Sequence, residues 1–235
     1  MDVIILCAGF GSRLMPLTEH KPKCMVEING IPLIDRLVNQ IRASKENANI
    51  NIVAGYKKEI LLKHFHNSEI NIVENEFYAS SNNMYSCYLA LNKFDEFKDT
   101  LIINGDCIYE DQLIHKACNL DTSTIIADRS FFNEESMKVK TFNDYVIEMS
   151  KNLTKEDYTF TSIDMYFFKE SEVNTLFETI KTIIDQKDIN SWTEVAIDTI
   201  CRKNPTLIKV DLFDNLNWYE IDDKHDLRAA EKIFG

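Results

Sequence analysis

Glycine, proline and tryptophan are scarce in this chain of 235 residues, which contains six glycines, four prolines and two tryptophans. So little glycine and proline excludes a collagen-like repeat and a low-complexity linker protein. No apolar run approaches the roughly 20 residues that cross a bilayer. The short apolar run at residues 3–7 follows an acidic residue and lacks the basic start of a secretory signal. We therefore expect no membrane partner and a cytoplasmic location.

Positive charge is also in short supply, since 26 Lys and Arg residues face 38 Asp and Glu residues and the formal net charge is −12. Such a chain is repelled by a polyanion, which argues against nucleic acid and favours small ligands. The six cysteines show no C-x-x-C pair and no metal-finger spacing, so we expect reduced thiols. The length and a hydrophobic content of 45% suffice for a core without disulfides.

Short β-branched runs alternate with amphipathic helical patterns in the first half of the chain. Strands are predicted at 3–6, 50–53, 70–73 and 101–103, and helices at 33–43 and 57–65. This alternation indicates a mostly parallel sheet with helices on both faces. The first and last of these strands are continuously apolar, so we expect them to be buried on both faces.

The second half of the chain has a more mixed pattern. Strands of partly antiparallel character are predicted at 123–127, 137–142, 145–149 and 159–168. Ser171 is expected to cap one helix, Ser191 to open a second through a capping box, and Asp222 or Asp223 to begin the last. No linker or repeat divides the chain. We therefore predict a single α/β domain over residues 1–235, with local insertions.

Two of the six glycines, Gly9 and Gly11, lie directly after the first predicted strand. Glycine lets backbone N–H groups close on an oxyanion, and ligands of open α/β sheets bind at the carboxyl ends of strands. The pair indicates a phosphate cradle, although an ordinary tight turn accounts for it equally well. Leu14 stands where a dinucleotide-binding fingerprint needs a third glycine, and no P-loop motif occurs. A long loop that carries Arg13 and Lys23 is therefore predicted.

Three segments carry a resemblance to a known family. L-C-A-G-F-G-S-R-L-M-P-L-T at 6–18, with K-P-K at 21–23, resembles the signature of the sugar-phosphate nucleotidyltransferase superfamily. N-N-M-Y-S-C-Y-L at 82–89 and W-Y-E-I-D at 218–222 resemble the LicC-like choline-phosphate cytidylyltransferases. The resemblance implies a Rossmann-like fold, and a CTP-dependent cytidylyltransferase that uses Mg²⁺ and a small phosphorylated acceptor and releases pyrophosphate.

The resemblance also implies a nucleotide-binding part at about 1–120 and an acceptor-binding part at about 121–235. The residues expected at the nucleotide are Leu6, Ala8, Gly9, Gly11, Ser12, Asn83 and Ser86. A plain helix start is the alternative for Asn83. The choice of cytosine over uracil rests on the resemblance alone.

Two carboxylates and two cations are expected to carry the chemistry. Asp106 follows the buried strand 101–103, at the same sheet edge as the glycine loop, where a carboxylate beside a triphosphate suits Mg²⁺. Asp222 resembles the family's second metal-binding aspartate, unless it caps the last helix in place of its neighbour. Arg13 and Lys23 are expected to neutralise charge on the α-phosphate and the leaving pyrophosphate.

The acceptor is less well defined by the sequence. Trp192 matches an aromatic position of the choline-phosphate relatives, and Glu194 is placed to meet an ammonium group or to close its capping box. Lys138 resembles a lysine that holds the acceptor phosphate in other relatives, with an exposed strand lysine as the alternative, and Arg129 is a second candidate anion contact. We expect a polar or zwitterionic phosphate, such as glutamine phosphate, to surpass phosphocholine, and the product to serve surface polysaccharide decoration.

Two other functions stay open at this point. One is a sugar-1-phosphate nucleotidyltransferase that uses UTP or dTTP, against which the short chain counts. The other is a non-catalytic, nucleotide-binding regulatory subunit, against which the joint presence of Arg13, Lys23, Asp106 and Asp222 argues. The sequence carries no signal for the oligomeric state.

Overall fold

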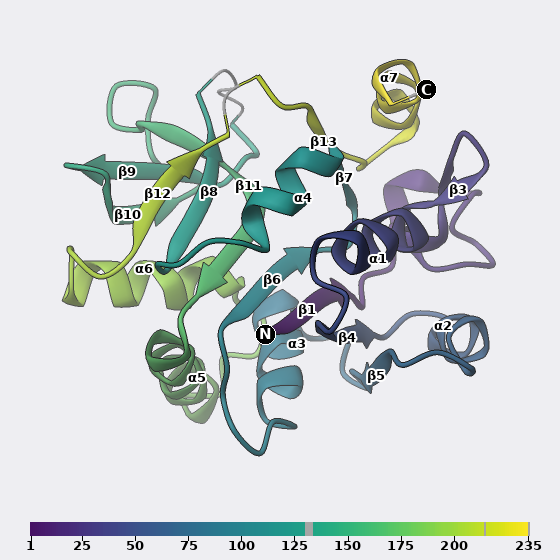
Figure 1. Cartoon of the computed structure of the whole chain (residues 1–235), viewed down its shortest axis with the longest axis horizontal. Coiled ribbons are helices and arrows are strands. Elements are labelled where there is room, and N and C mark those ends of the chain that lie inside the picture. The colour runs from purple at the N-terminus through teal and green to yellow at the C-terminus, as the bar shows by residue number, and fades with distance from the viewer. Residues whose placement is uncertain (130–133, 214, 235) are drawn as a thin grey trace.

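The computed structural model describes residues 1–129, 134–213 and 215–234, with a nine-stranded sheet at its centre (Figure 1). The order of the strands across the sheet is β5-β4-β1-β6-β11-β8-β12-β10-β9. In chain order they are β1 (Asp2–Cys7), β4 (Asn49–Ala54), β5 (Asn71–Glu74), β6 (Thr100–Asn104), β8 (Thr124–Asp128), β9 (Lys138–Phe142), β10 (Tyr145–Ser150), β11 (Phe160–Phe168) and β12 (Lys209–Leu212). Two small ribbons pair β2 (Glu27–Ile28) with β3 (Ile31–Pro32) and β7 (Cys107–Tyr109) with β13 (Trp218–Glu220).

Strand direction changes halfway across the sheet. β5, β4, β1 and β6 run parallel to one another, as predicted for the first half of the chain. β11 then runs antiparallel to both β6 and β8, and β9 and β10 form an antiparallel pair. The predicted mixed, mostly parallel α/β fold is therefore confirmed, and the parallel half supplies one continuous edge of strand carboxyl ends.

Helices cover both faces of this sheet (Figure 1). They are α1 (Leu33–Ser44), α2 (Lys58–His64), α3 (Asn83–Leu91), α4 (Asp111–Ala117), α5 (Glu170–Asp185), α6 (Thr193–Lys203) and α7 (Lys224–Ile233). α1, α2 and α4 contribute to the core on one face, and α3, α5 and α6 to the core on the other. Successive residues of β1 alternate between the two cores: Ile5 belongs to the first and Ile4 to the second.

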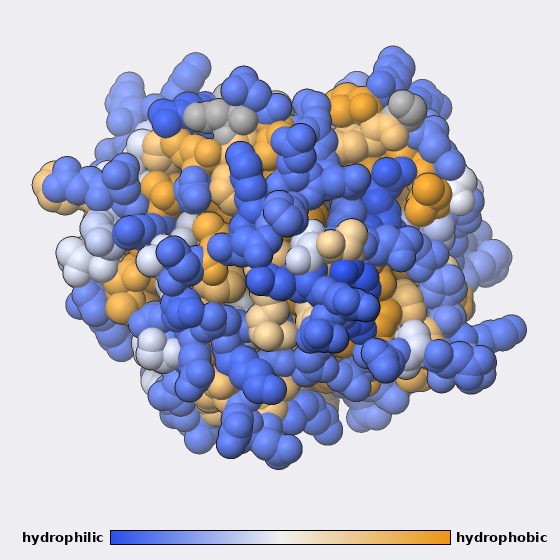
Figure 2. Space-filling view, viewed as in Figure 1, coloured by the Kyte–Doolittle hydropathy of each residue, from blue (hydrophilic) through white to orange (hydrophobic). Residues whose placement is uncertain are grey.

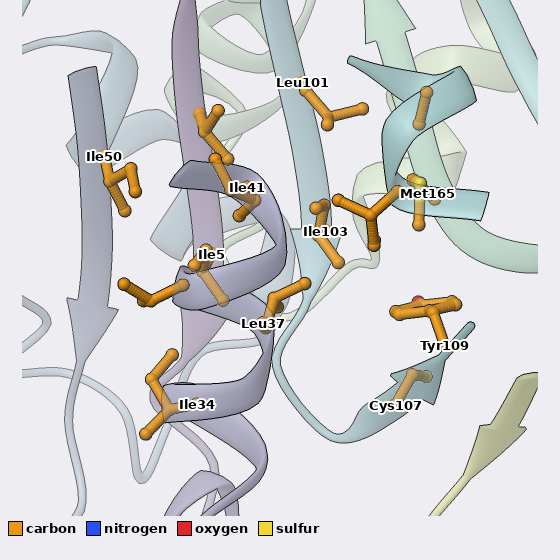
Figure 3. Packing of buried hydrophobic residues seen from close by; sticks show 14 of the residues in the cluster. Ile5, Ile34, Leu37, Ile41, Ile50, Leu101, Ile103, Cys107, Tyr109 and Met165 are labelled. Atoms are coloured by element: carbon orange, nitrogen blue, oxygen red, sulfur yellow. The ribbon is translucent and has the colours of Figure 1, made fainter. Parts of the chain in front are cut away.

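The first of these cores shows why the parallel strands are so uniformly apolar. Ile34, Leu37 and Ile41 of α1 lie against Ile5 of β1 and Ile103 of β6 (Figure 3), and all five are at most 2% exposed. Full burial of such a side chain stabilises the fold by about 1.5–3 kcal/mol. β1 and β6 are buried on both faces, as predicted, so a ligand can reach these strands only at their ends.

The helix starts differ in part from those predicted. α5 begins at Glu170 rather than after Ser171, and α6 begins at Thr193 with Trp192 as its N-cap, so no Ser191 capping box forms. α3 and α4 were not predicted as full helices. α3 has no clean apolar stripe because it lies between the sheet and α5 and α6, with several of its sides buried. α4 has only seven residues.

The surface is mostly polar. Hydrophilic residues cover most of the face shown in Figure 2, and apolar residues are scattered between them. Among the residues that the structure describes, no helix combines the length and hydropathy needed to cross a membrane.

The start of α7 separates the roles of two neighbouring aspartates. The Asp223 carboxylate accepts hydrogen bonds from the backbone N–H groups of His225 (2.7 Å) and Asp226 (3.0 Å). In return, the Asp226 carboxylate accepts a hydrogen bond from the Asp223 N–H at 3.0 Å. Asp223 is therefore the N-cap, within a capping box, and the Asp222 side chain is left available for other partners.

We expect Asp223→Ala to lower the free energy of unfolding by about 1 kcal/mol, because two backbone donors lose their acceptor. Urea unfolding followed by circular dichroism measures this difference. Asp223→Asn is the matched control: its amide oxygen still caps the helix, so it should lose only a few tenths of a kcal/mol. If the alanine variant were as stable as the wild type, the side chain would not be acting as the cap.

Candidate active site

The carboxyl ends of β1 and β6 open into a cavity of about 410 Å³. Its wall includes residues from the loop after β1, from the end of β6, from the start of α6 and from the segment around β13. This is the sheet edge at which open α/β sheets bind their ligands.

The structure brings most of the predicted site residues to this cavity. The seven predicted nucleotide-binding residues all line it: Leu6, Ala8, Gly9, Gly11, Ser12, Asn83 and Ser86. So do the four residues predicted for catalysis and metal binding, together with Trp192 and Glu194. Arg129 and Lys138 lie outside it.

The loop after β1 is shaped by Gly11. Its φ of 61° lies in the left-handed region, and an added Cβ would come 2.9 Å from Cβ of Lys23, so only glycine fits without a shift. Thr18 closes the loop by donating its hydroxyl to the Gly11 carbonyl oxygen at 2.8 Å. A Cβ on Gly9 would meet no atom within 4 Å, so the backbone there is open to close approach by a ligand.

Lys23 joins the two aspartates. Its ammonium donates to Asp106 Oδ2 and to Asp222 Oδ1, each at 2.8 Å, and the guanidinium of Arg13 reaches Asp222 Oδ2 at 2.9 Å. The Ile221 N–H donates to the Asp106 carbonyl oxygen at 2.9 Å, which fixes the two segments beside each other. Although burial lowers the pKa of Lys23, the carboxylates of Asp106 and Asp222 raise it above its ordinary value.

A third carboxylate, Glu220, lies beside Asp106 and Asp222 and was not predicted from the sequence. One oxygen each of Asp106, Glu220 and Asp222 lie within 4.8 Å of one another. Burial, followed by the charges of Asp106 and Asp222, raises the pKa of Glu220 to about 7. Three converging carboxylates are the oxygen ligands that Mg²⁺ prefers, so the donor set fits a divalent cation.

Another part of the cavity wall combines aromatic, acidic and basic groups. Trp192 and Glu194 lie there, together with Lys151, Asp164 and Trp218. The Lys151 ammonium lies 4.7 Å from the centroid of the Trp192 ring. The Trp218 indole donates to Asp128 Oδ2 at 2.9 Å. Lys151 and Asp164 were not predicted, although a single carboxylate within the apolar run of β11 was a signal for Asp164.

Comparison with known proteins agrees with this arrangement. A family model described as nucleotidyl transferase matches residues 2–135, more than half of the chain. The chain belongs to this nucleotidyltransferase family. The predicted enzyme class is therefore confirmed, and the cavity described above is the candidate active site.

Two curated relatives match almost the whole chain. A bifunctional protein GlmU from Methanococcus aeolicus is 32% identical over 98% of this chain, and the chain spans only 53% of that protein. A CTP:phosphoglutamine cytidylyltransferase from Campylobacter jejuni is 28% identical over 97% of this chain and 98% of its own length. The chain therefore spans about half the length of the first relative and almost all of the second.

Solved structures match the fold. The CTP:phosphocholine cytidylyltransferase LicC of Streptococcus pneumoniae has a TM-score of 0.81 at 24% identity, over 100% of this chain and 99% of its own. The inositol-1-phosphate CTP transferase of T. maritima has a TM-score of 0.75 at 19% identity, over 98% and 96%. At these identities the likeness shows that the nucleotidyltransferase fold is shared.

Lys138 was predicted to contact the acceptor, but its side chain is buried away from the cavity wall. Its side chain is 1% exposed, and its ammonium donates to the carbonyl oxygens of Glu134 (2.9 Å), Ser136 (3.3 Å) and Lys151 (2.6 Å). β9 pairs with β10 on one side and with β11 on the other, which buries its first residue. The sequence pattern indicates a strand there but not its two neighbours.

The bonds of Lys138 join two segments that border the cavity. One contains Glu135 and Ser136, and the other contains Lys151, whose ammonium faces Trp192. Arg129 is also displaced from the predicted site: it is exposed at the end of β8, and its guanidinium lies 5.3 Å from the Phe160 ring centroid. The lysine that lines the cavity beside Trp192 is Lys151.

We expect Lys138→Met to lower the free energy of unfolding by about 1–3 kcal/mol, because three part-buried carbonyl oxygens lose a charged donor. Urea unfolding of the purified variant measures this. Lys140→Met is the matched control on the same strand, where the ammonium pairs with Asp157 at 3.3 Å near the surface. Its loss should stay below about 1 kcal/mol. Equal losses in the two variants would contradict the assigned role of Lys138.

Proposed function

We propose that this nucleotidyltransferase transfers the cytidylyl group of CTP to a small phosphorylated acceptor and releases pyrophosphate. The observation that carries the proposal is that one cavity joins the glycine loop and the Lys23–Asp106–Asp222 cluster to a second end with its own lysine, Lys151. The similarity to the CTP:phosphoglutamine cytidylyltransferase of Campylobacter jejuni, which covers 97% of this chain, supports CTP as the donor.

The nucleotide end is built mainly by residues of the first 120 positions. In the proposal, the backbone of Ala8 and Gly9 faces the pyrimidine, and the Gly11–Ser12 turn receives the phosphates. Ser86 and Asn83 form the polar wall beside them. The Asn75 amide donates to Ser86 Oγ at 3.0 Å, and Asn83 Oδ1 accepts from the Thr193 N–H at 2.9 Å, so both side chains are held in place.

The proposed reaction is an in-line displacement. An oxygen of the acceptor phosphate attacks the α-phosphorus of CTP, the bond from that phosphorus to the bridging oxygen breaks, and pyrophosphate leaves with that electron pair. The attacking oxygen is already anionic, so no side chain has to remove a proton. Catalysis then consists of positioning and charge neutralisation.

The residues of the cavity divide this work. Lys23 and Arg13 neutralise the α-phosphate and the leaving pyrophosphate, and Lys151 holds the acceptor phosphate. Asp106, Asp222 and Glu220 are the residues that would hold Mg²⁺, which when bound supplies further neutralisation of the nucleotide phosphates. The product is a CDP-linked precursor, which we place ahead of the transferases that decorate surface polysaccharides.

Pyrophosphate release, measured with CTP, UTP, ATP, GTP and dTTP against a panel of phosphorylated acceptors, tests the proposed donor. We expect kcat/KM with CTP to exceed that with any other nucleotide at least tenfold. The acceptor panel includes glucose 1-phosphate and N-acetylglucosamine 1-phosphate. Turnover of these sugars with UTP or dTTP, and none with CTP, would identify a sugar-phosphate nucleotidyltransferase instead. No turnover with any pair would leave only nucleotide binding.

Asp106→Asn tests the acidic cluster. We expect it to fold normally and to lose activity by roughly 10²-fold or more, as when one electrostatic contact to the transition state is removed. Asp111→Asn is the matched control, because Asp111 lies at the start of α4, accepts from Gln40 at 2.8 Å and is absent from the cavity wall. A near wild-type rate for Asp106→Asn at saturating Mg²⁺ would contradict the assignment.

A further inference from the structure

Glu194 is a buried carboxylate with one unsatisfied oxygen. The residue lines the cavity and is only 4% exposed. Oε1 accepts from the Tyr166 hydroxyl at 2.7 Å, whereas Oε2 has no hydrogen-bond partner. An unsatisfied buried oxygen of this kind is unfavourable, and more so if it is charged. The group is therefore expected to meet a donor when the site is occupied.

Asp164 is held in the same wall by an unusual backbone. Its φ of 60° lies in the left-handed region, which is uncommon for a residue with a side chain, and the register of β11 against β8 shifts between Ser162 and Tyr166. Such a conformation is strained and persists only where the surrounding structure holds it. The bulge places a carboxylate in the cavity wall at a point where the neighbours Ile163 and Met165 belong to the core.

The Tyr166 hydroxyl lies between these two carboxylates. It is 2.7 Å from Glu194 Oε1 and 3.3 Å from Asp164 Oδ1, and it receives a hydrogen bond from Ser162 Oγ at 3.2 Å. A phenol has one hydrogen, so it satisfies only one carboxylate at a time. The other contact of Asp164 is the Cys107 thiol at 3.9 Å, which is a weak donor.

Neither carboxylate has a cationic partner at salt-bridge distance within the described part of the chain. The nearby lysine, Lys151, lies over the Trp192 ring at 4.7 Å and forms no salt bridge with either residue in the described structure. The two acidic groups meet at one hydroxyl, which can donate to only one of them at a time, and neither is paired with a cation among the described residues.

We propose that Asp164 and Glu194 bind a protonated primary amino group, so that the preferred acceptor is a phosphomonoester that also carries a primary ammonium. This inference rests on the proposed function, in which this end of the cavity receives the acceptor. An ammonium brings one positive charge and three N–H donors, which match the unsatisfied Glu194 Oε2 and the poorly satisfied Asp164. Lys151 is left to hold the phosphate.

A quaternary ammonium does not fit this arrangement. A trimethylammonium has no N–H to donate, so Glu194 Oε2 would stay unsatisfied in its presence. Such groups are bound instead over exposed aromatic faces. One face of Trp192 is already covered by the ammonium of Lys151. A neutral hydroxyl brings one donor but no charge, and so it satisfies the two carboxylates only in part.

A series of N-methylated acceptors isolates the N–H donors at constant charge. Phosphoethanolamine, its N-methyl and N,N-dimethyl derivatives and phosphocholine carry three, two, one and no N–H donors on the same cationic scaffold. We expect kcat/KM with CTP to fall along the series, by at least tenfold between its ends. Phosphoethanolamine should also exceed 2-hydroxyethyl phosphate, in which a neutral hydroxyl replaces the ammonium. A flat or rising series, or a preference for the hydroxyl compound, would overturn the inference.

Glu194→Gln keeps the bond with Tyr166 and removes the charge. It should reduce kcat/KM for phosphoethanolamine at least tenfold, leave 2-hydroxyethyl phosphate within threefold of wild type and leave the KM for CTP unchanged. Glu148→Gln, at a carboxylate paired with Arg202 away from the cavity, is the control. Asp164→Gly relieves the left-handed backbone, so it should fold at least as stably and still lose selectivity along the series. Wild-type selectivity in both cavity variants would overturn the inference.

Calorimetric binding of phosphoethanolamine and phosphocholine to the enzyme alone separates the inference from the proposed function. Tighter binding of phosphoethanolamine without turnover by CTP would refute cytidylyl transfer and keep the ammonium site. Turnover with CTP and tighter binding of phosphocholine would keep the function and refute the ammonium site. Absence of binding by either compound, with CTP turnover of acceptors that lack an amine, would also refute it.

Discussion

The ammonium of Lys23, held at 2.8 Å from both Asp106 and Asp222, is the interaction on which the site depends. It ties together the loop after β1, the end of β6 and the segment after β13, which come from three distant parts of the chain. The backbone bond from Ile221 to Asp106 sets the spacing, and the Asp223 cap frees Asp222 to take part. Without a cation between them, two half-buried carboxylates at this distance would repel each other.

The cavity is strongly acidic even for a chain of net charge −12. At one end lie Lys23 and Arg13 with their carboxylate partners, and burial, followed by the charges of Asp106 and Asp222, raises the pKa of Glu220 to about 7. At the other end burial raises the pKa of Asp164 and of Glu194. The two ends therefore differ in charge pairing: Asp106 and Asp222 pair with Lys23 and Arg13, whereas Asp164 and Glu194 have no salt-bridge partner among the described residues. Under the proposed function, the first end would receive the cations that accompany a triphosphate, and the second would receive a cation that belongs to the acceptor.

Lys138 shows how a charged residue can shape such a site without entering it. Its ammonium donates to three carbonyl oxygens, and these bonds hold the segment at 134–136 beside the backbone of Lys151. Burial lowers the pKa of this lysine, and the ring of carbonyl oxygens offsets the cost of desolvation. The side chain that resembled a phosphate contact in the sequence thus fixes the position of another lysine.

Local pattern was enough to predict the strands of the parallel half, the glycine loop, a cap at Asp222 or Asp223 and the meeting of Asp106 with that loop. Each of these depends on a run of neighbouring residues or on the rule that strand ends share an edge. The burial of Lys138, the strained backbone of Asp164 and the unsatisfied oxygen of Glu194 depend on which strands become neighbours and where a register shifts. Those are contacts between segments far apart in the chain, and only the tertiary structure decides them, because burial and charge pairing are properties of the assembled sheet.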